Sequence, residues 1–225
     1  MKERPILMSA PMVRAILAGT KTQTRRVVKP QPFDGPLELA VHLARRGHYR
    51  WFDESAERGW SCPYGQPGDR LWVRETFQAL SADDVDVYRD NWWALCDYKT
   101  GKGYKVSYPA TDGIKEFVTM DDDISQACSP SIHMPRWASR ITLEITGVRV
   151  ERLQDISEAD ALAEGINRIA HGREGYFYHA TRTEPHPRNW CFPDGAYREL
   201  WEQINGPGSW DANPWVWAVE FRRAK

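Results

Sequence analysis

The segment at 139–153, SRITLEITGVRVERL, is the feature of this sequence that most constrains its fold. Apolar residues alternate along it in two phases, the first with Ile141, Leu143 and Ile145 and the second with Val148 and Val150. Successive side chains of a strand point to opposite faces, so a change of phase requires an extra residue or a bend. Gly147 lies at the change, where a bulge is expected. We therefore predict one long bent strand in a small curled β-barrel rather than in a flat sheet.

Three helices and further strands are predicted around this segment. Ser9 and Gly19 bound one apolar helical stripe as N-cap and stop, and Ser157 and Gly165 bound a second. A third short helix is predicted within 193–206. Apolar and alternating runs predict strands at 5–8, 70–77 and 213–223, with a short extended path at 26–29.

The predicted strand at 70–77 carries a carboxylate on its apolar side. Leu71, Val73 and Phe77 share a face with Glu75, whereas Arg74 points to the other face. A carboxylate among apolar neighbours is costly unless a cation pairs with it. Glu75 is therefore either the partner of a buried cation or a functional group, and Arg74 cannot be that partner from the opposite face.

The rest of the sequence is predicted to form three insertions on a single domain that spans residues 1–225. The insertions, at 30–66, 79–136 and 167–193, lack strong periodicity and are rich in Pro, Gly, Asp, Trp and Tyr. The patterned core then comprises 1–29, 67–78, 137–166 and 194–225. We expect an α+β fold in which short helices flank a small β-barrel, with most of the 11 tryptophans used in packing.

Composition argues against several classes of protein. No apolar run reaches the roughly 20 residues of a membrane-spanning helix, and the N-terminus has no long apolar signal segment, so we expect a cytoplasmic protein. The four cysteines form no CxxC pair and the six histidines have no metal-ligand spacing. Reduced thiols, no metal and no cofactor are the resulting expectations.

Charge is unevenly distributed although the net charge is only −1. Residues 1–50 carry 10 Lys and Arg against 3 Asp and Glu, whereas residues 51–135 carry 8 against 15. This asymmetry fits either a local basic face for a polyanion or two solvated patches that pair within the fold.

The first predicted helix runs into LAGTKTQTRR at 17–26, which places Lys21, Thr24, Arg25 and Arg26 within six positions. Gly19, Lys21 and Arg26 resemble the G-x-K-x-x-x-x-R signature of the ASCH domain family, whose members have a PUA-like β-barrel fold. The segments PGDRLWVRE, ISEADALAEG and VWAVEFRR then follow in the family's order. The overall likeness is to tryptophan-rich ASCH proteins of phages and prophages, and more distantly to the small bacterial N4-acetylcytidine amidohydrolases.

The resemblance implies a metal-independent amidohydrolase that acts on an N4-acylcytidine-type nucleoside. Lys21 and Thr24 match two catalytic positions of these enzymes directly, and Glu164 matches the third by its place in the short helix after the long strand. Other ASCH proteins are proposed ribonucleases or RNA binders. The alternative is therefore a module that binds RNA or modified DNA, with RNA favoured, and performs no reaction.

Amide hydrolysis needs a nucleophile, a base, an acid and donors for the developing oxyanion. Burial and neighbouring cations would lower the pKa of Lys21 and allow it to act as the base. Glu164 is expected to act as an acid or to hold Lys21 in place. The sequence leaves open whether Thr24 attacks the acyl carbon or positions a water.

Four further residues, Arg25, Arg26, Arg74 and Glu75, are the expected substrate-binding groups. Arg26 is predicted either to contact a phosphate, carbonyl or oxyanion or to pair with Glu75. The inward position of Glu75 favours the pairing.

Overall fold

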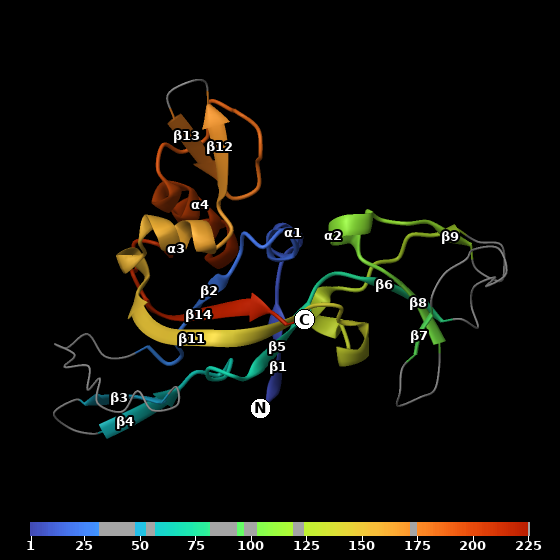
Figure 1. Cartoon of the computed structure of the whole chain (residues 1–225), viewed down its shortest axis with the longest axis horizontal. Helices are drawn as coiled ribbons and strands as arrows, with labels where there is room; N and C mark the ends of the chain where they lie inside the picture. Colours follow the sequence, from blue (N-terminus) through green and yellow to red (C-terminus); the bar gives the residue numbers. More distant parts are fainter. Residues whose placement is uncertain are drawn as a thin grey trace. The chain divides into compact units, whose positions relative to one another are not determined.

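The computed structural model describes residues 1–31, 48–52, 57–81, 94–96, 103–118, 124–171 and 175–224. Within these ranges the chain is a mixed α+β protein with a five-stranded sheet, smaller sheets and short helices (Figure 1). The predicted α+β class is confirmed. None of the helices in the described ranges is long and apolar enough to cross a membrane.

The five-stranded sheet has the order β1-β5-β11-β14-β2. Its strands are β1 (Glu3–Leu7), β5 (Arg70–Arg74), β11 (Thr142–Arg152), β14 (Trp215–Arg223) and β2 (Gln23–Val27). Smaller sheets join β3 (His48–Phe52) to β4 (Glu57–Ser61), β9 (Phe117–Val118) to β10 (Ile124–Ser125), β12 (Asn167–His171) to β13 (Gly175–His179), and β8 (Gly103–Ser107) to both β6 (Gln78–Ser81) and β7 (Ala94–Cys96). The helices are α1 (Ala10–Leu17), α2 (Pro109–Asp112), α3 (Glu158–Ala163) and α4 (Pro193–Asn205), with 3-10 turns η2 (Ser131–His133), η3 (Arg136–Ala138) and η4 (Leu153–Asp155).

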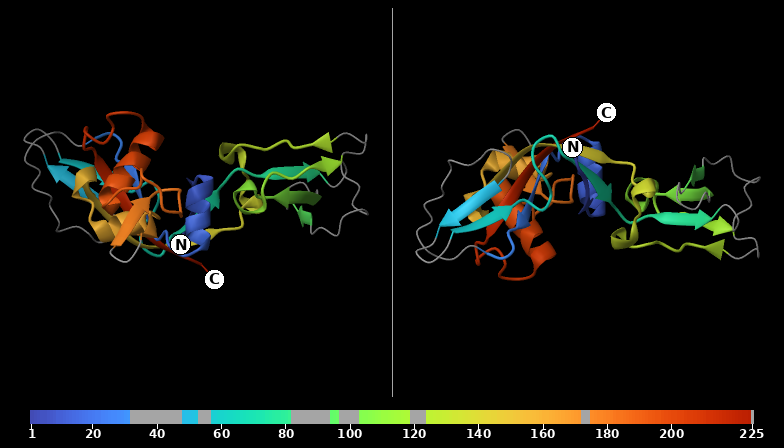
Figure 2. Two further views of the ribbon diagram at one scale, coloured as in Figure 1. Left: turned by 90° about the horizontal axis from the view of Figure 1, so that it is seen from above. Right: turned by 90° about the horizontal axis from the view of Figure 1, so that it is seen from below.

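The chain divides into two compact units. The first comprises Met1–Glu3, Ala15–Arg70 and Leu143–Lys225, and the second comprises Arg4–Arg14 and Leu71–Thr142. The stretches predicted as insertions contain short strands, among them β6, β7 and β8, which lie side by side in the second unit (Figure 2). Strands this short give little periodic signal in the sequence. The single domain with three insertions stays a prediction.

In the first unit, β14 lies between β11 and β2 and is antiparallel to both. The predicted interruption of β11 is confirmed, because its register with β14 shifts between Ile145 and Gly147. Val216 and Ala218 are as deeply buried as Trp217, so both faces of β14 are packed.

The helix α1 ends before Gly19, as predicted, and the chain then enters β2. Gly19 has a φ of +77°, and the N–H groups of Thr20 and Lys21 donate to the carbonyl of Ala15. The strand β2 begins at Gln23 and pairs with β14. The extended path therefore starts three residues earlier than predicted, and half of the 19–26 motif is strand rather than loop.

The helix α3 has the predicted caps. The Ser157 side chain accepts a hydrogen bond from the backbone N–H of Asp160 at 3.1 Å. Ile156 and Ala161 stand at the two positions of a hydrophobic staple, and both are buried in one core cluster. Glu164 is the C-cap residue, and Gly165 follows with a φ of +96°.

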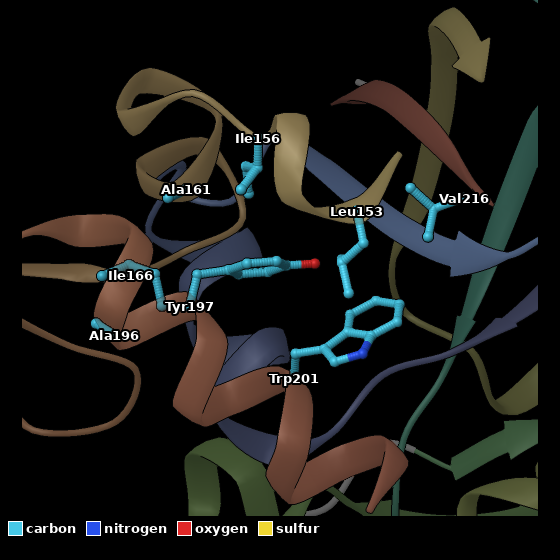
Figure 3. Close-up of a cluster of buried hydrophobic side chains, with 8 residues drawn as sticks. All are labelled: Leu153, Ile156, Ala161, Ile166, Ala196, Tyr197, Trp201 and Val216. Atoms are coloured by element: carbon cyan, nitrogen blue, oxygen red, sulfur yellow. The ribbon is translucent and has the colours of Figure 1, made fainter. Parts of the chain in front are cut away.

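That core cluster joins η4, α3, α4 and β14 (Figure 3). Its buried members are Leu153, Ile156, Ala161, Ile166, Ala196, Tyr197, Trp201 and Val216. Tyr197 and Trp201 are both buried on α4, and their ring centroids are 6.3 Å apart. Ile204, three positions further along, is 52% exposed, so the buried face of α4 ends at Trp201.

The hairpin of β12 and β13 is fixed to the loop that follows it by a buried histidine. The Nδ1 atom of His179 accepts hydrogen bonds from the backbone N–H groups of Thr181 and Arg182, both at 3.0 Å. The ring proton is therefore on Nε2, which lies 3.9 Å from the Glu199 carboxylate. Burial lowers the pKa of His179, Arg182 and His186 lower it further, and Glu199 opposes them.

Because of His179, we predict that the unfolding free energy depends on pH. The unfolded chain gains a proton as the pH falls below about 6.5, and folded His179 takes it up only at lower pH, so the unfolding free energy should fall in this window. Urea unfolding at a series of pH values between 5 and 8 measures this change in the unfolding free energy. His179→Asn keeps an acceptor in place of Nδ1 and cannot titrate, and it should flatten the dependence. An unchanged pH profile in that variant would assign the dependence to other groups.

Candidate functional site

Lys21 and Glu164, predicted from two distant segments, meet in the first unit. Lys21 pairs with Glu164 as an isolated β-bridge just before β2. Its Nζ atom donates to both the backbone oxygen and the Oε2 atom of Glu164, each at 2.7 Å. The side chains are 0% and 3% exposed, so this ion pair is shielded from water.

Arg25 extends the pair into a charged network. Its guanidinium approaches Oε1 of Glu164 at 3.2 Å, the carboxylate of Asp160 at 3.1 Å and Oε1 of Glu151 at 2.8 Å from Nε. The side chain of Arg25 is fully buried. One cation therefore holds three carboxylates that come from β11, α3 and the C-cap of α3.

The partly exposed end of the network is formed by Arg149 on β11. Its guanidinium contacts Glu151 at 2.8 Å and Asp160 at 2.9 Å, and it also pairs with Glu220 of β14. The Arg149 side chain is a third exposed, so the network reaches solvent at this end. We define the network as the charged cluster, with members Lys21, Arg25, Arg149, Glu151, Asp160, Glu164 and Glu220.

Sequence reasoning missed Arg149, Glu151, Asp160 and Glu220 as members of the charged cluster. A signal was present, because Arg149 and Glu151 alternate with Val148 and Val150 beyond Gly147. Two charges on one face of a strand that is otherwise apolar indicate a polar contact on that face.

Thr24 is buried, but it does not join the charged cluster. Its Oγ1 atom has no hydrogen-bond partner in the described part of the chain, and the residue is 1% exposed. Thr24 pairs with Val219 within β2 and β14, so its side chain points away from the face that carries Gln23 and Arg25. The structure therefore brings together two of the three predicted catalytic residues, and the buried Thr24 hydroxyl has no hydrogen bond to a described residue.

The surroundings of Lys21 lower the pKa of its amine. Burial lowers the pKa of Lys21, because the ammonium loses its hydration, whereas Glu164 opposes this effect. Arg26 and Arg25 lower the pKa of Lys21 further. The ring of Tyr197 lies 5.9 Å from the Arg25 guanidinium, and burial raises the pKa of this phenol well above its ordinary value.

The four predicted substrate-binding residues lie in different places. Arg25 belongs to the charged cluster, whereas Arg26 follows it on the other face of β2, donates to the Arg25 carbonyl at 3.3 Å and interacts with Tyr64. Arg74 belongs to the second unit, where its guanidinium lies 5.5 Å from the Trp72 ring centroid. Glu75 also belongs to the second unit.

The predicted pairing of Arg26 with Glu75 is wrong, although the prediction that buried Glu75 needs a cation is confirmed. The partner is Arg140, which donates from Nε at 2.9 Å and from NH2 at 3.0 Å to the two carboxylate oxygens. Glu75 is 2% exposed, and the Arg140 guanidinium stacks 4.0 Å from the centroid of Tyr108. The pair is an internal support of the second unit.

Gly165 controls how closely α3 approaches Lys21. A Cβ atom at this position would lie 3.1 Å from the Ala15 Cβ and 3.2 Å from the Lys21 Cβ, and its φ is +96°. Gly206 has the same φ, but a Cβ there would meet no atom within 4 Å. The two glycines thus share the same positive φ and differ in the space available.

Gly165→Ala should cost about 2–3 kcal/mol of unfolding free energy, and Gly206→Ala about 1 kcal/mol. The larger cost at Gly165 reflects the close packing against Lys21, since both variants place a side chain at the same positive φ. Thermal or urea unfolding of the two variants provides the comparison. Equal losses would mean that the chain near Lys21 relaxes without cost.

In the described ranges, no group of three or more His, Cys, Asp or Glu side chains converges as a metal-binding group. Part of the basic N-terminal segment, including Arg45 and Arg46, lies outside the described residues. Comparison of the chain with protein-family models, with curated proteins and with solved structures gives no match.

Proposed function

We propose that this chain is an ASCH-type protein with a PUA-like fold that hydrolyses the amide of an N4-acylated cytosine nucleoside. The observation that carries the proposal is the buried contact of Lys21 with Glu164, at 2.7 Å. The motif at 19–26, the bent strand β11 and the capped helix α3 support it by their order along the chain.

Lys21 is proposed as the general base. Burial lowers the pKa of Lys21, which raises the fraction of neutral amine that can accept a proton from water. The water oxygen then bonds to the acyl carbon, and the carbonyl π bond opens to an oxyanion. Glu164, hydrogen-bonded to Nζ, holds the amine in place and shares the proton with it.

Collapse of this intermediate breaks the bond between the acyl carbon and N4 of the base. The proton held by the Lys21–Glu164 pair passes to the leaving N4 amine, so the products are the carboxylic acid and cytidine. Arg25, which contacts Glu164 at 3.2 Å, keeps that carboxylate oriented. Water is proposed as the nucleophile because Thr24 points away from the face that carries Arg25 and makes no hydrogen bond to Lys21 among the described residues.

The direct test is incubation of the purified protein with N4-acetylcytidine, with an oligonucleotide that contains it, and with an N6-acyladenosine control, followed by mass spectrometry. Release of cytidine from the first substrate supports the proposal, and release from the adenosine analogue would widen the substrate class. No product from any acylated cytosine would overturn it. A protein mass increased by one acyl group, mapped to Thr24, would replace water by the threonine as nucleophile.

A further inference from the structure

We infer that the hairpin of β12 and β13 carries a binding surface for single-stranded nucleic acid, separate from the charged cluster. We define this surface as the aromatic face, formed by Arg168, Tyr176, Tyr178 and Trp190. The inference does not depend on the proposed hydrolysis, since a strand can bind this surface whether or not the Lys21 site is active.

The strand register places these four residues on one side of the hairpin. Arg168 pairs with Tyr178, and Tyr178 also forms a β-bridge with Trp190 on its other edge. Residues directly opposite each other in a sheet project to the same face, and Tyr176 lies two positions from Tyr178 on that face. The backbone of Trp190 is held by hydrogen bonds of 2.8 and 2.9 Å to Tyr178. Trp190 thus pairs with the edge of β13 that lies opposite β12.

Large aromatic surface is exposed on this face. Tyr176 is 47% exposed and Trp190 is 42% exposed, while Tyr178 is half-buried against the core cluster. Phe192, 63% exposed, follows Trp190 at the start of α4. Several exposed rings within one short segment are unusual on a surface that has no ligand.

These rings are held rigidly rather than free to turn. The Trp190 Nε1 atom donates to Glu199 at 2.6 Å, and a Cβ at Gly195 would lie 2.6 Å from the Trp190 ring. The Arg168 guanidinium lies 3.6 Å from the Tyr176 centroid. Ordered aromatic rings are suited to base stacking, because little side-chain entropy is lost on binding.

The charge around the aromatic face favours a polyanion over a protein partner. Segment 175–192 holds Arg182 and Arg188, and Arg168 adds a third cation from β12. The nearby carboxylates are those of Glu184 and of Glu199, which accepts a hydrogen bond from Trp190. Arg168 and Arg188 are exposed. Aromatic rings for bases next to guanidinium groups for phosphates are the combination that single-strand binders use, and such surfaces bind duplexes weakly because paired bases are not available for stacking.

The test is a titration of fluorescently labelled RNA and DNA single strands, and of the matching duplexes, followed by anisotropy at low and moderate salt. We expect the intact chain to prefer single strands. Tyr176→Leu should weaken binding by roughly 5- to 100-fold through lost stacking. Arg168→Gln should weaken binding and lower the slope of log K against log salt concentration by about 0.7.

Two controls match these variants. Ile204→Ala removes an equally exposed apolar side chain from α4, and Arg222→Gln removes an exposed cation from β14. Both should bind as the intact chain does, and thermal unfolding should show that all four variants are folded.

Equal binding by Tyr176→Leu and the intact chain would overturn the inference, and so would equal affinity for duplex and single strand. A chain that binds no strand but self-associates, with Tyr176→Leu restoring the monomer, would assign the aromatic face to a protein contact instead. Strand binding without release of cytidine would leave this inference standing while the proposed hydrolysis fails.

Discussion

Lys21→Arg should lower the rate of N4-acylcytidine hydrolysis by about 10²- to 10⁴-fold, the contribution of a general base. Arginine keeps the positive charge beside Glu164 but cannot give up its proton in this range of pH. Lys21→Met removes both charge and base, and it should lose activity to the same extent. The measurement is the initial rate of cytidine release at saturating substrate.

The dependence of the hydrolysis rate on pH distinguishes a Lys21 that acts as a base from one that has only a structural role. Burial lowers the pKa of Lys21, so the fraction of neutral amine, and with it the rate, should rise with pH through a pKa below that of a free lysine. Lys29→Met, which changes an exposed lysine of the same segment, should leave both the rate and the profile unchanged. A folded Lys21→Arg variant with full activity would exclude the lysine as base.

Arg140→Met should destabilise the second unit by about 3 kcal/mol, the lower end of the cost of leaving a buried charge unpaired. Glu75 would then keep its carboxyl group at 2% exposure without its bidentate partner. The lower end applies because the Arg140 side chain is 25% exposed and water can enter in its place. Urea unfolding measures the change.

The double variant Glu75→Leu/Arg140→Met gives this prediction its control. Removing both charges leaves no unpaired group, so the double variant should be more stable than Arg140→Met alone. A double variant that is less stable than either single one would mean that the guanidinium mainly serves to pack on Tyr108, from whose ring centroid it lies 4.0 Å.

Local patterns in the sequence predicted the elements that local forces determine. The capped start of α3 at Ser157 and the interruption of β11 at Gly147 depend on neighbouring residues, and both are present. The buried face of 70–77 is also present, although β5 ends at Arg74. In each case the relevant interactions span only a few positions.

Partners far apart in the sequence were harder to predict. Arg140 lies 65 positions from Glu75, and no local rule selects it from the chain's 30 Lys and Arg residues. The contact of Lys21 with Glu164 spans 143 positions and was expected only through the family resemblance. The separation of Thr24 from that contact depends on where β2 begins, and strand ends are the least predictable part of a pattern.

The interrupted register of β11 also divides that strand into two parts with different tasks. Before Gly147, Leu143 and Ile145 are buried in the apolar interior, and beyond it Arg149 and Glu151 enter the charged cluster. Without the extra residue, one continuous phase would govern both parts. The bulge therefore lets the polar half of the strand change its sequence, and with it the chemistry of the site, while the apolar half keeps its packing.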